Sequence, residues 1–428
     1  MRILLGLWRL LVGGLWLAAV GALTLRGAEI DPERLAELQS VCVICGTRGT
    51  ADAILNIVLF LPLGLVLGGG RRALVLALVA GATVAGGIEL LQTLLPGRHP
   101  SPADVVFNAM GAALGTRIHA LAARRVRTDA ASGAGGIGWL WGGAVGACFL
   151  VAGVLLTPHP PDDDYWGQWM PDLGWMPQYE GVVVSAELNG RHMPWGRLDH
   201  EGPHRELLDG DWRLDGRIVV GPSPDAVSPI LSIYDGHQRE ALLLGAHRDA
   251  IVFREWTIGK RLRFDAPDVR IPGAFGPLVP GDTTFIGASR RAATTCLRLG
   301  EVEWCGLGIT PGRTWGFLLY LEGLDESIRE LADLLWLLGL FLPVGFFAIA
   351  RWDFAGGTAL GVGGLLLAPA LTSMIPGPWP ELAACLVGVA LGRVGLWALR
   401  AVVYHESGGG QPPGRAQVES VRSIDASV

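Results

Sequence analysis

The placement of its apolar residues is the feature that most constrains this chain. Long apolar runs occupy both ends of the 428 residues, and charged residues concentrate in the middle, from about Pro158 to Arg329. Charged residues make up only 17 % of the chain, against about 25 % in ordinary soluble domains. The sequence therefore predicts a membrane part and a soluble part in one polypeptide.

Eight apolar segments are long enough to cross a bilayer as helices, which takes about 20 residues. They are residues 3–25, 51–69, 73–95, 103–121, 137–156, 331–350, 355–375 and 382–403. The first segment is too long for the apolar core of a signal peptide and lacks a clear cleavage site, so we interpret it as a retained signal anchor. The tail after His405 is rich in Gly, Pro and Ser and is predicted to be disordered.

Arginine residues decide the predicted orientation, because short cytoplasmic loops carry an excess of Arg and Lys. Alternate loops of this chain carry Arg71, Arg72, Arg117, Arg124, Arg125, Arg127, Arg351 and Arg400. The opposite loops include the acidic run 162–164, and Trp166 and Trp169 beyond the fifth span fit a membrane interface. We therefore expect a multi-pass protein of the cell membrane, with both termini in the cytoplasm and the middle of the chain outside.

Three landmarks occur twice, in the same order and at nearly the same spacing. Residues 59–64 resemble 340–345, residues 95–97 resemble 375–377, and residues 111–115 resemble 388–392. They predict a degenerate duplication of a three-helix unit, made of spans two to four and six to eight, in parallel orientation. The small-xxx-small pairs Gly111/Gly115 and Gly388/Gly392 allow close helix contact. The alternative is that apolar helices are simply rich in Gly and Ala.

The first unit carries polar side chains that the second unit has mostly lost. They are Asn56, Glu89, Gln92, Arg98, Asp104 and Asn108. Glu89 and Gln92 share one helix face, Asp104 and Asn108 share another, and Arg98 lies in the turn between the two helices. We expect these side chains to gather near the outer leaflet. They form either a pocket for a charged or hydroxylated head group, with Arg98 on a phosphate or carboxylate, or a structural network that binds nothing.

The polar residues belong to a longer ordered pattern between Asp52 and Gly115. It comprises Asn56, residues 60–64, 88–92, 96–98 and 101–105, then Asn108, Gly111 and Gly115. In this order the pattern resembles the VanZ-like membrane family, which takes its name from a protein linked to low-level teicoplanin resistance. The resemblance implies that these residues are the family's signature, and it implies no particular reaction.

From about Gly181 to Glu322, short alternating apolar runs are separated by turn signals, as in β-strands. The dipeptide at Asp235 and Gly236 predicts a hairpin. The segment therefore predicts an all-β sandwich. The runs at 229–236, 242–245 and 251–254 resemble concanavalin A-like (laminin G-like) jelly rolls, a fold that often binds carbohydrate. We see no closely spaced carboxylate pair of the kind a laminarinase-type glucanase needs.

The predicted fold is thus a polytopic α-helical membrane protein with two degenerate three-helix repeats and an inserted jelly-roll sandwich. The expected parts are the signal anchor and outer loop (1–50), the VanZ-like unit (51–127), a linking span (128–157), the sandwich (158–328), the second unit (329–404) and the tail (405–428). Cys296 and Cys305 fall on neighbouring strands, where an oxidising compartment favours a disulfide. Cys42 and Cys45 have no second ligand pair nearby, so we expect a disulfide or free thiols there and no metal site.

Three functions fit this organisation. The first is an envelope protein that binds a glycan or glycolipid through the sandwich and a membrane lipid head group through the polar hairpin. The second is a membrane enzyme on a lipid-linked substrate, with Glu89 or Asp104 as base and Arg98 holding the substrate. The third is a transporter, which the loss of polar groups from the second unit disfavours. The net charge of −6 gives no support for nucleic-acid binding, and we expect no cofactor.

Overall fold

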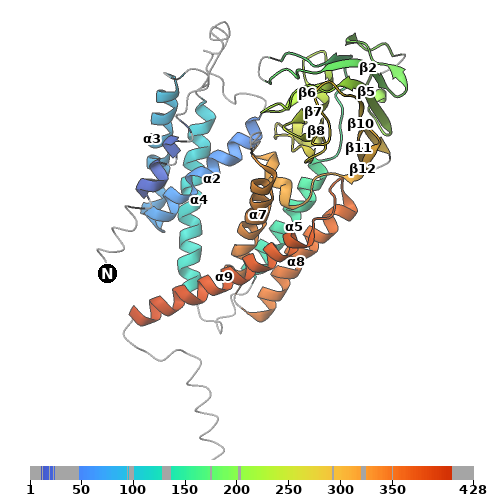
Figure 1. Cartoon of the computed structure of the whole chain (residues 1–428). Coiled ribbons are helices and arrows are strands. Elements are labelled where there is room, and N and C mark those ends of the chain that lie inside the picture. Colours follow the sequence, from blue (N-terminus) through green and yellow to red (C-terminus); the bar gives the residue numbers. More distant parts are fainter. Residues whose placement is uncertain are drawn as a thin grey trace, which may run out of the picture.

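The computed structural model describes residues 48–93, 95, 101–127, 136–173, 176–200, 204–291, 294–319, 324–348 and 350–406, together with residues 11–24 except 12, 19 and 23. Figure 1 shows two groups of helices, with a β-sandwich at one end of the second group. The predictions for Arg98, Cys42, Cys45 and the tail after residue 406 lie outside the described residues.

The helices follow the apolar runs of the sequence. The first group comprises α2 (Gly49–Leu67), α3 (Arg71–Gln92) and α4 (Pro102–Arg127), and the second comprises α5 (Ile137–Leu155), α7 (Glu326–Phe347), α8 (Arg351–Leu371) and α9 (Trp379–Glu406). Among the described helices, six are long and apolar enough to cross a membrane, namely all of these except α4. Polar and charged residues such as Asp104 and Arg117 interrupt the apolar surface of α4. The predicted spans at 3–25 and 103–121 therefore stay predictions.

Glycines set the closest helix contacts. A Cβ atom on Gly111 of α4 would collide with the carbonyl oxygen of Ile57 on α2, and one on Gly388 of α9 would collide with that of Leu338 on α7. Small residues let two helix backbones approach in this way. The close contact predicted for the small-xxx-small pairs is therefore confirmed. Helices α5 and α8 meet through glycines as well, at Gly142 and Gly364 among others.

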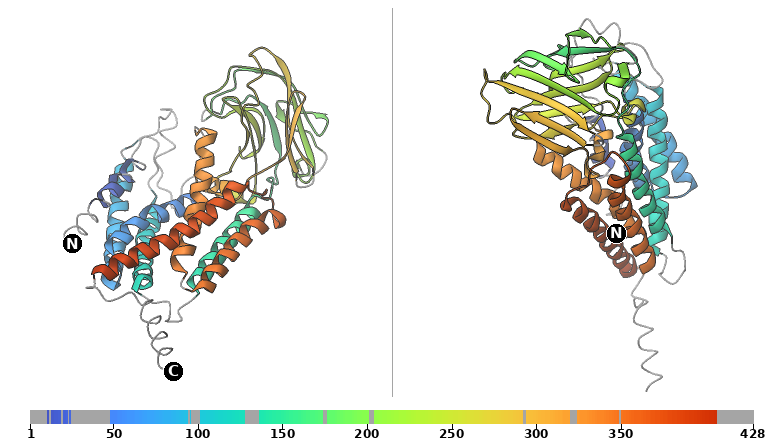
Figure 2. Two further views of the ribbon diagram at one scale, coloured as in Figure 1. Left: turned by 60° about the horizontal axis from the view of Figure 1, so that its bottom comes forward. Right: turned by 90° about the vertical axis from the view of Figure 1, so that its right-hand side faces the viewer.

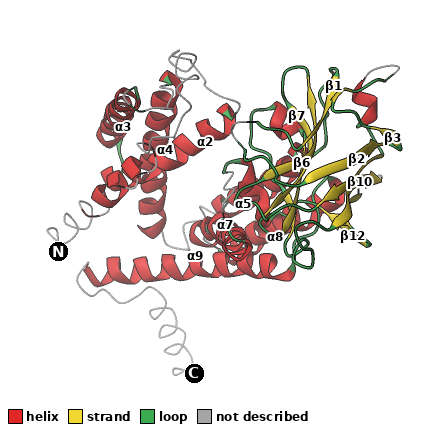
Figure 3. Ribbon diagram, turned by 45° about the horizontal axis from the view of Figure 1, so that its top comes forward, coloured by secondary structure: helices red, strands yellow, loops and turns green. Residues whose placement is uncertain are grey.

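The soluble part is a sandwich of two antiparallel sheets, as predicted. One sheet has the order β4-β1-β6-β7-β8-β9 and the other the order β12-β11-β10-β5-β2-β3. Their strands are β1 (Tyr165–Trp169), β2 (Val182–Leu188), β3 (Arg191–His192), β4 (Gly196–Arg197), β5 (Trp212–Val219), β6 (Ser228–Asp235), β7 (Glu240–His247), β8 (Ala250–Glu255), β9 (Val269–Ile271), β10 (Thr283–Arg291), β11 (Thr294–Leu299) and β12 (Val302–Leu307). Figure 3 shows these strands in yellow beside the red helices.

Alternation of side chains builds the sandwich core. On β5, Trp212, Leu214 and Ile218 point into the core, whereas Arg217 points to solvent. Because successive side chains of a strand point to opposite faces, this period of two buries one face of the sheet. The predicted hairpin at Asp235 is confirmed, since β6 and β7 pair across it.

The first strand was missed by the sequence interpretation. Trp166 and Trp169 lie on β1, which pairs with β6 in the sandwich. Their assignment to a membrane interface is therefore wrong. A five-residue strand rich in Trp and Gly carries too little alternation to be distinguished from an interfacial loop.

The sandwich rests on the ends of helices from both groups. The backbone N–H groups of Thr50 and Ala51, at the start of α2, donate to the carbonyl oxygen of Arg263 at 3.2 and 3.4 Å. Ile309 and Phe317, which follow β12, pack into the apolar core of the second group. Figure 2 shows from two other sides that the sandwich lies at one end of the helices. We call this end the sandwich side.

Candidate functional site

Three of the predicted polar residues, Asn56, Glu89 and Asp104, meet at the sandwich side of the first helical group. There α2 and α4 begin and α3 ends, so side chains from three helices come together. The backbone N–H of Ser101 donates to Oε2 of Glu89 at 2.6 Å. The carboxylate of Asp104 accepts hydrogen bonds from the side chains of Asn56 and Ser101. We call Asn56, Glu89, Asp104 and Asn108, together with Asp52 and Ser101, the polar cluster.

Two members of the polar cluster were not identified from the sequence. Asp52 interacts electrostatically with Asp104 and with Arg48, and Ser101 links Glu89 to Asp104. Asp52 precedes Asn56 by four residues on α2, and side chains at that spacing share a helix face. That spacing is the signal that could have found it. Ser101 lies in the VanZ-like pattern at 101–105, but its spacing does not reveal its two contacts, which are its backbone N–H with Glu89 and its side chain with Asp104.

Charge in the polar cluster is predominantly negative. The carboxylates of Asp52 and Glu89 each repel that of Asp104, and Arg48 attracts Asp52. Carboxylate and amide oxygens accept hydrogen bonds and attract cations. The arrangement therefore suits a group that carries hydrogen-bond donors and positive charge.

The two remaining predicted residues behave differently from each other. Gln92 donates from Nε2 to the carbonyl oxygen of Thr24 at 2.9 Å, so it fastens the N-terminal helical segment to α3. Asn108 is 5 % exposed, and its Oδ1 has no hydrogen-bond partner among the described residues. A buried polar atom of this kind costs free energy unless a partner is supplied. Asn108 follows Asp104 by one helical turn on α4, so it belongs to the same face.

The second helical group has a counterpart whose partners come from the chain itself. Glu381, at the start of α9, is 3 % exposed. It accepts a hydrogen bond from Oγ1 of Thr310 at 2.5 Å and one from the backbone N–H of Gly312 at 2.9 Å. These donors belong to the segment that follows β12. The carboxylate on α9 is therefore covered by part of the sandwich domain.

A second carboxylate of this counterpart is covered by the same segment. Nε of Arg313 lies 3.0 Å from both oxygens of Asp333 on α7, and Nε1 of Trp315 donates to Asp333 at 2.6 Å. Arg313 also donates to Glu326 at 2.8 Å. We call residues 310–315 the internal plug. It supplies a hydroxyl, a backbone amide, an indole N–H and a guanidinium to two buried carboxylates.

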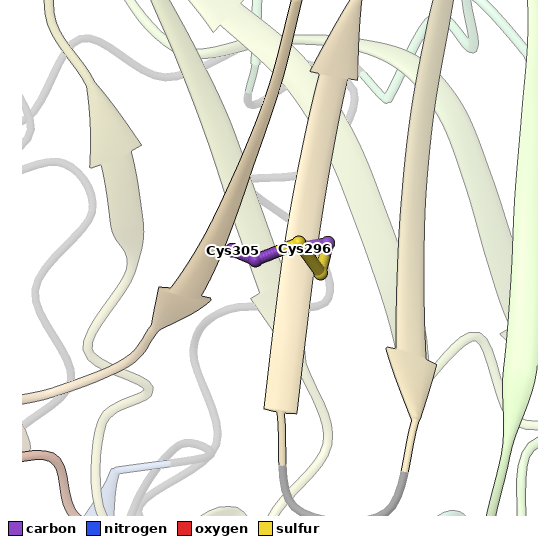
Figure 4. The surroundings of a disulfide bond; sticks show 2 residues. All are labelled: Cys296 and Cys305. Atoms are coloured by element: carbon purple, nitrogen blue, oxygen red, sulfur yellow. A yellow bond between two sulfur atoms is a disulfide. The ribbon is translucent and has the colours of Figure 1, made fainter.

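The predicted disulfide is present. Cys296 on β11 lies opposite Cys305 on β12, with 4.1 Å between their Cα atoms, and Figure 4 shows the bond joining the two strands. Metal ligation by these sulfur atoms is excluded by the bond. Another group that could hold an ion, Asp163, Asp235 and His237, is occupied by its own contacts, because Nδ1 of His237 lies 2.8 Å from Asp163 and Asp235 pairs with Arg239.

Comparison with protein-family models gives a match over the part of the chain that contains the polar cluster. Residues 22–123 match the family model VanZ/LLP1. The matched range contains α2, α3, all of α4 except its last four residues, and every residue of the polar cluster. The search of curated proteins and that of solved structures found no match, so the resemblance of the sandwich to concanavalin A-like jelly rolls stays a prediction. Residues 22–123 of this chain thus form a VanZ-like domain, followed by a two-sheet β-sandwich that is inserted between two groups of helices.

Proposed function

We propose that this membrane protein binds the head group of a membrane lipid in the polar cluster of its VanZ-like domain. The observation that carries the proposal is the meeting of Asn56, Glu89 and Asp104, linked through Ser101, at one end of three helices. Ionisable groups within membrane-spanning helices are costly and are commonly functional. The loop arginines predict that this end faces the outer leaflet.

We further propose that α2 to α4 and α7 to α9 are the predicted duplicated units, with α5 as the linking span between them. Gly64 of α2 contacts Ala112 of α4 as Gly345 of α7 contacts Val389 of α9. If Gly64 is aligned with Gly345, then Asp52 is aligned with Asp333, because each aspartate lies twelve residues before its glycine. The same correspondence aligns Asp104 with Glu381, eight residues before Ala112 and Val389. The carboxylates of the polar cluster thus have counterparts under the internal plug.

The internal plug indicates which ligand chemistry suits the polar cluster. In the second group, Asp333 and Glu381 take hydrogen bonds from a guanidinium, an indole, a hydroxyl and a backbone amide. By the proposed correspondence, Asp52 and Asp104 suit a ligand with similar donors and a positive charge. An ammonium-bearing lipid head group offers both, and Arg98 is the residue proposed for its phosphate.

Native mass spectrometry of the detergent-purified full-length protein tests this proposal. The probes are phosphatidylethanolamine, whose head group carries an ammonium group, and phosphatidylglycerol with matched acyl chains, whose head group carries none. We expect the wild type to retain phosphatidylethanolamine preferentially, and Glu89→Gln and Asp104→Asn to weaken that retention about tenfold through loss of charge-assisted hydrogen bonds.

The matched control is Glu301→Gln, which removes one carboxylate from an exposed turn of the sandwich. Retention by this variant should equal that of the wild type. Equal retention of both lipids by the wild type and by the two cluster variants, at equal thermal stability, would show that the polar cluster is only a structural network.

A further inference from the structure

A pocket lies on the sandwich domain, beside the start of α2. Its volume is about 600 Å³, and it is bordered by residues 159–162, by Lys260 and Arg261 at the end of the short helix α6 (Ile258–Arg261), by Arg263 just after it, and by Arg205, Arg239 and Trp256. Five of its lining side chains are cationic and one is a carboxylate. They are Arg205, Arg239, Lys260, Arg261 and Arg263 against Asp162. We call it the basic pocket.

The positive charge of the basic pocket is incompletely balanced. Arg239 pairs with Asp235, and Arg205 lies 3.8 Å from Asp209. Within the described part of the chain, no carboxylate oxygen lies within 4.0 Å of the charged nitrogens of Lys260, Arg261 or Arg263. Among the residues that the structure describes, these three cations therefore have no ion-pair partner in the pocket.

The positive charge of the basic pocket affects the protonation of His159, which lines it. Nη1 of Arg261 lies 2.8 Å from Nε2 of His159. Burial, Arg205 and Arg261 together lower the pKa of His159, so its neutral ring accepts that hydrogen bond. Burial also lowers the pKa of Lys260, although Glu240 and Asp265 oppose the change. The contributions of Arg205 and Arg261 to the shift of His159 show that both guanidinium groups act on this part of the pocket, where an anion would be favoured.

The backbone holds the basic pocket at the start of a membrane helix. Arg263 adopts a left-handed conformation, with φ of 64°, and its carbonyl oxygen accepts from the first N–H groups of α2. Oγ1 of Thr50 donates to the carbonyl oxygen of Leu262 at 2.6 Å. Residues 262 and 263 therefore contact the first turn of a candidate membrane span. The strained backbone is fixed by these contacts with the helix.

We infer that the basic pocket is a binding site for a phosphate ester. The oxygen atoms of a phosphate group can accept hydrogen bonds from several guanidinium and ammonium groups at once. Arginine can form two parallel hydrogen bonds with such a group. Two sources carry this group at a membrane surface: the phosphate of a lipid head group, and a phosphate ester in solution such as a unit of an envelope polymer. The site is separate in residues and charge from the polar cluster, so each can fail without the other.

The test measures binding to the full-length protein in uncharged detergent by isothermal titration calorimetry. The probes are dioctanoyl phosphatidylglycerol, sn-glycerol 1-phosphate and, as the phosphate-free reference, dioctanoylglycerol. The variant is Arg261→Gln with Arg263→Gln. Its matched control is Arg191→Gln with Arg217→Gln, which removes two exposed arginines elsewhere on the sandwich. A charge-preserving variant, Arg261→Lys with Arg263→Lys, separates loss of charge from loss of folding.

We expect the wild type, the control and the lysine variant to bind a phosphate-bearing probe, and the glutamine variant to bind it about tenfold more weakly. Binding of both phosphate probes supports a site open to solution, whereas binding of the lipid alone supports a head-group site. The inference is overturned if the wild type binds neither phosphate probe, if dioctanoylglycerol binds equally well, or if the glutamine variant binds like the wild type.

Discussion

Arg329 of α7 forms a buried ion pair with Asp268 of the sandwich domain, with 3.1 Å between Nη1 and Oδ1. Arg48, which precedes α2, forms an ion pair with Asp265 at 3.0 Å. The two aspartates are three residues apart, so one loop contacts the start of a helix in each group. The pair on α7 is the better buried, since the side chain of Arg48 is 36 % exposed and that of Arg329 is 4 % exposed. Solvent screens an exposed pair and weakens it.

Replacement of Asp268 tests how much this contact contributes to stability. Burial opposes the ionisation of Asp268, but Arg270 and Arg329 overcome it and lower its pKa to about 2. Asp268→Asn leaves the buried charges of Arg270 and Arg329 without their carboxylate, which typically costs about 3–5 kcal/mol. We expect a fall of that size in the free energy of unfolding, measured by circular dichroism in detergent. The exposed Asp249→Asn variant is the control, and equal stability of the two variants would contradict the prediction.

The stability of the sandwich should fall on mild acidification because of His247. Burial and Arg270 lower the pKa of His247, with smaller contributions from Arg248 and Arg329, against the hydrogen bond with the carbonyl of Asp225. The unfolded chain therefore binds a proton near pH 6.5 that the folded domain resists. The stabilisation is complete above that pH and is lost as the pH falls below it.

The measurement is the unfolding temperature at about pH 7.5 and about pH 5.5, on either side of the ordinary histidine pKa. We expect the difference between the two values to shrink in His247→Gln and to persist in His192→Gln, whose ring is exposed. An unchanged pH difference in His247→Gln would contradict the assignment.

The disulfide should stabilise the edge of one sheet. It closes a loop with a sequence separation of nine residues, and a constraint of that length contributes about 2–3 kcal/mol through the unfolded chain. Cys296→Ser with Cys305→Ser should lower the unfolding temperature, and a reducing agent should do the same to the wild type only. The Cys148→Ser variant, which alters a free thiol, serves as control. A wild type insensitive to reductant at its unfolding temperature would argue against this contribution.

Close packing of α2 on α4 should not tolerate a side chain at Gly111. Its Cβ position meets the backbone of Ile57, which cannot move aside without separating the helices. We expect Gly111→Leu to lose about 1–3 kcal/mol or more, in the range of overpacked cores. Gly86→Leu on α3, where the Cβ position has open space, is the matched control. Fluorescence-detected thermal unfolding in detergent compares them, and equal unfolding temperatures would refute the packing argument.

Local sequence pattern was enough for much of the fold and part of the site. Apolar runs located the six candidate spans, and alternation located the sandwich with its hairpin at Asp235. Spacings of three and four residues grouped Glu89 with Gln92 and Asp104 with Asn108. The prediction for Gln92 shows the limit of that reasoning: a shared helix face does not determine a partner, and its side chain turns to the carbonyl of Thr24.

The sequence by itself determined the candidate spans and most of the strands, although not β1, because hydrophobic period and length are local properties of the chain. Only the tertiary structure decided which distant groups meet. It brought Ser101 to Glu89, the internal plug to Glu381, and Arg205 and Arg239 to residues 260–263. These contacts join parts of the chain through turns and packed interfaces. Their geometry depends on how whole elements dock, and no local spacing of residues records it.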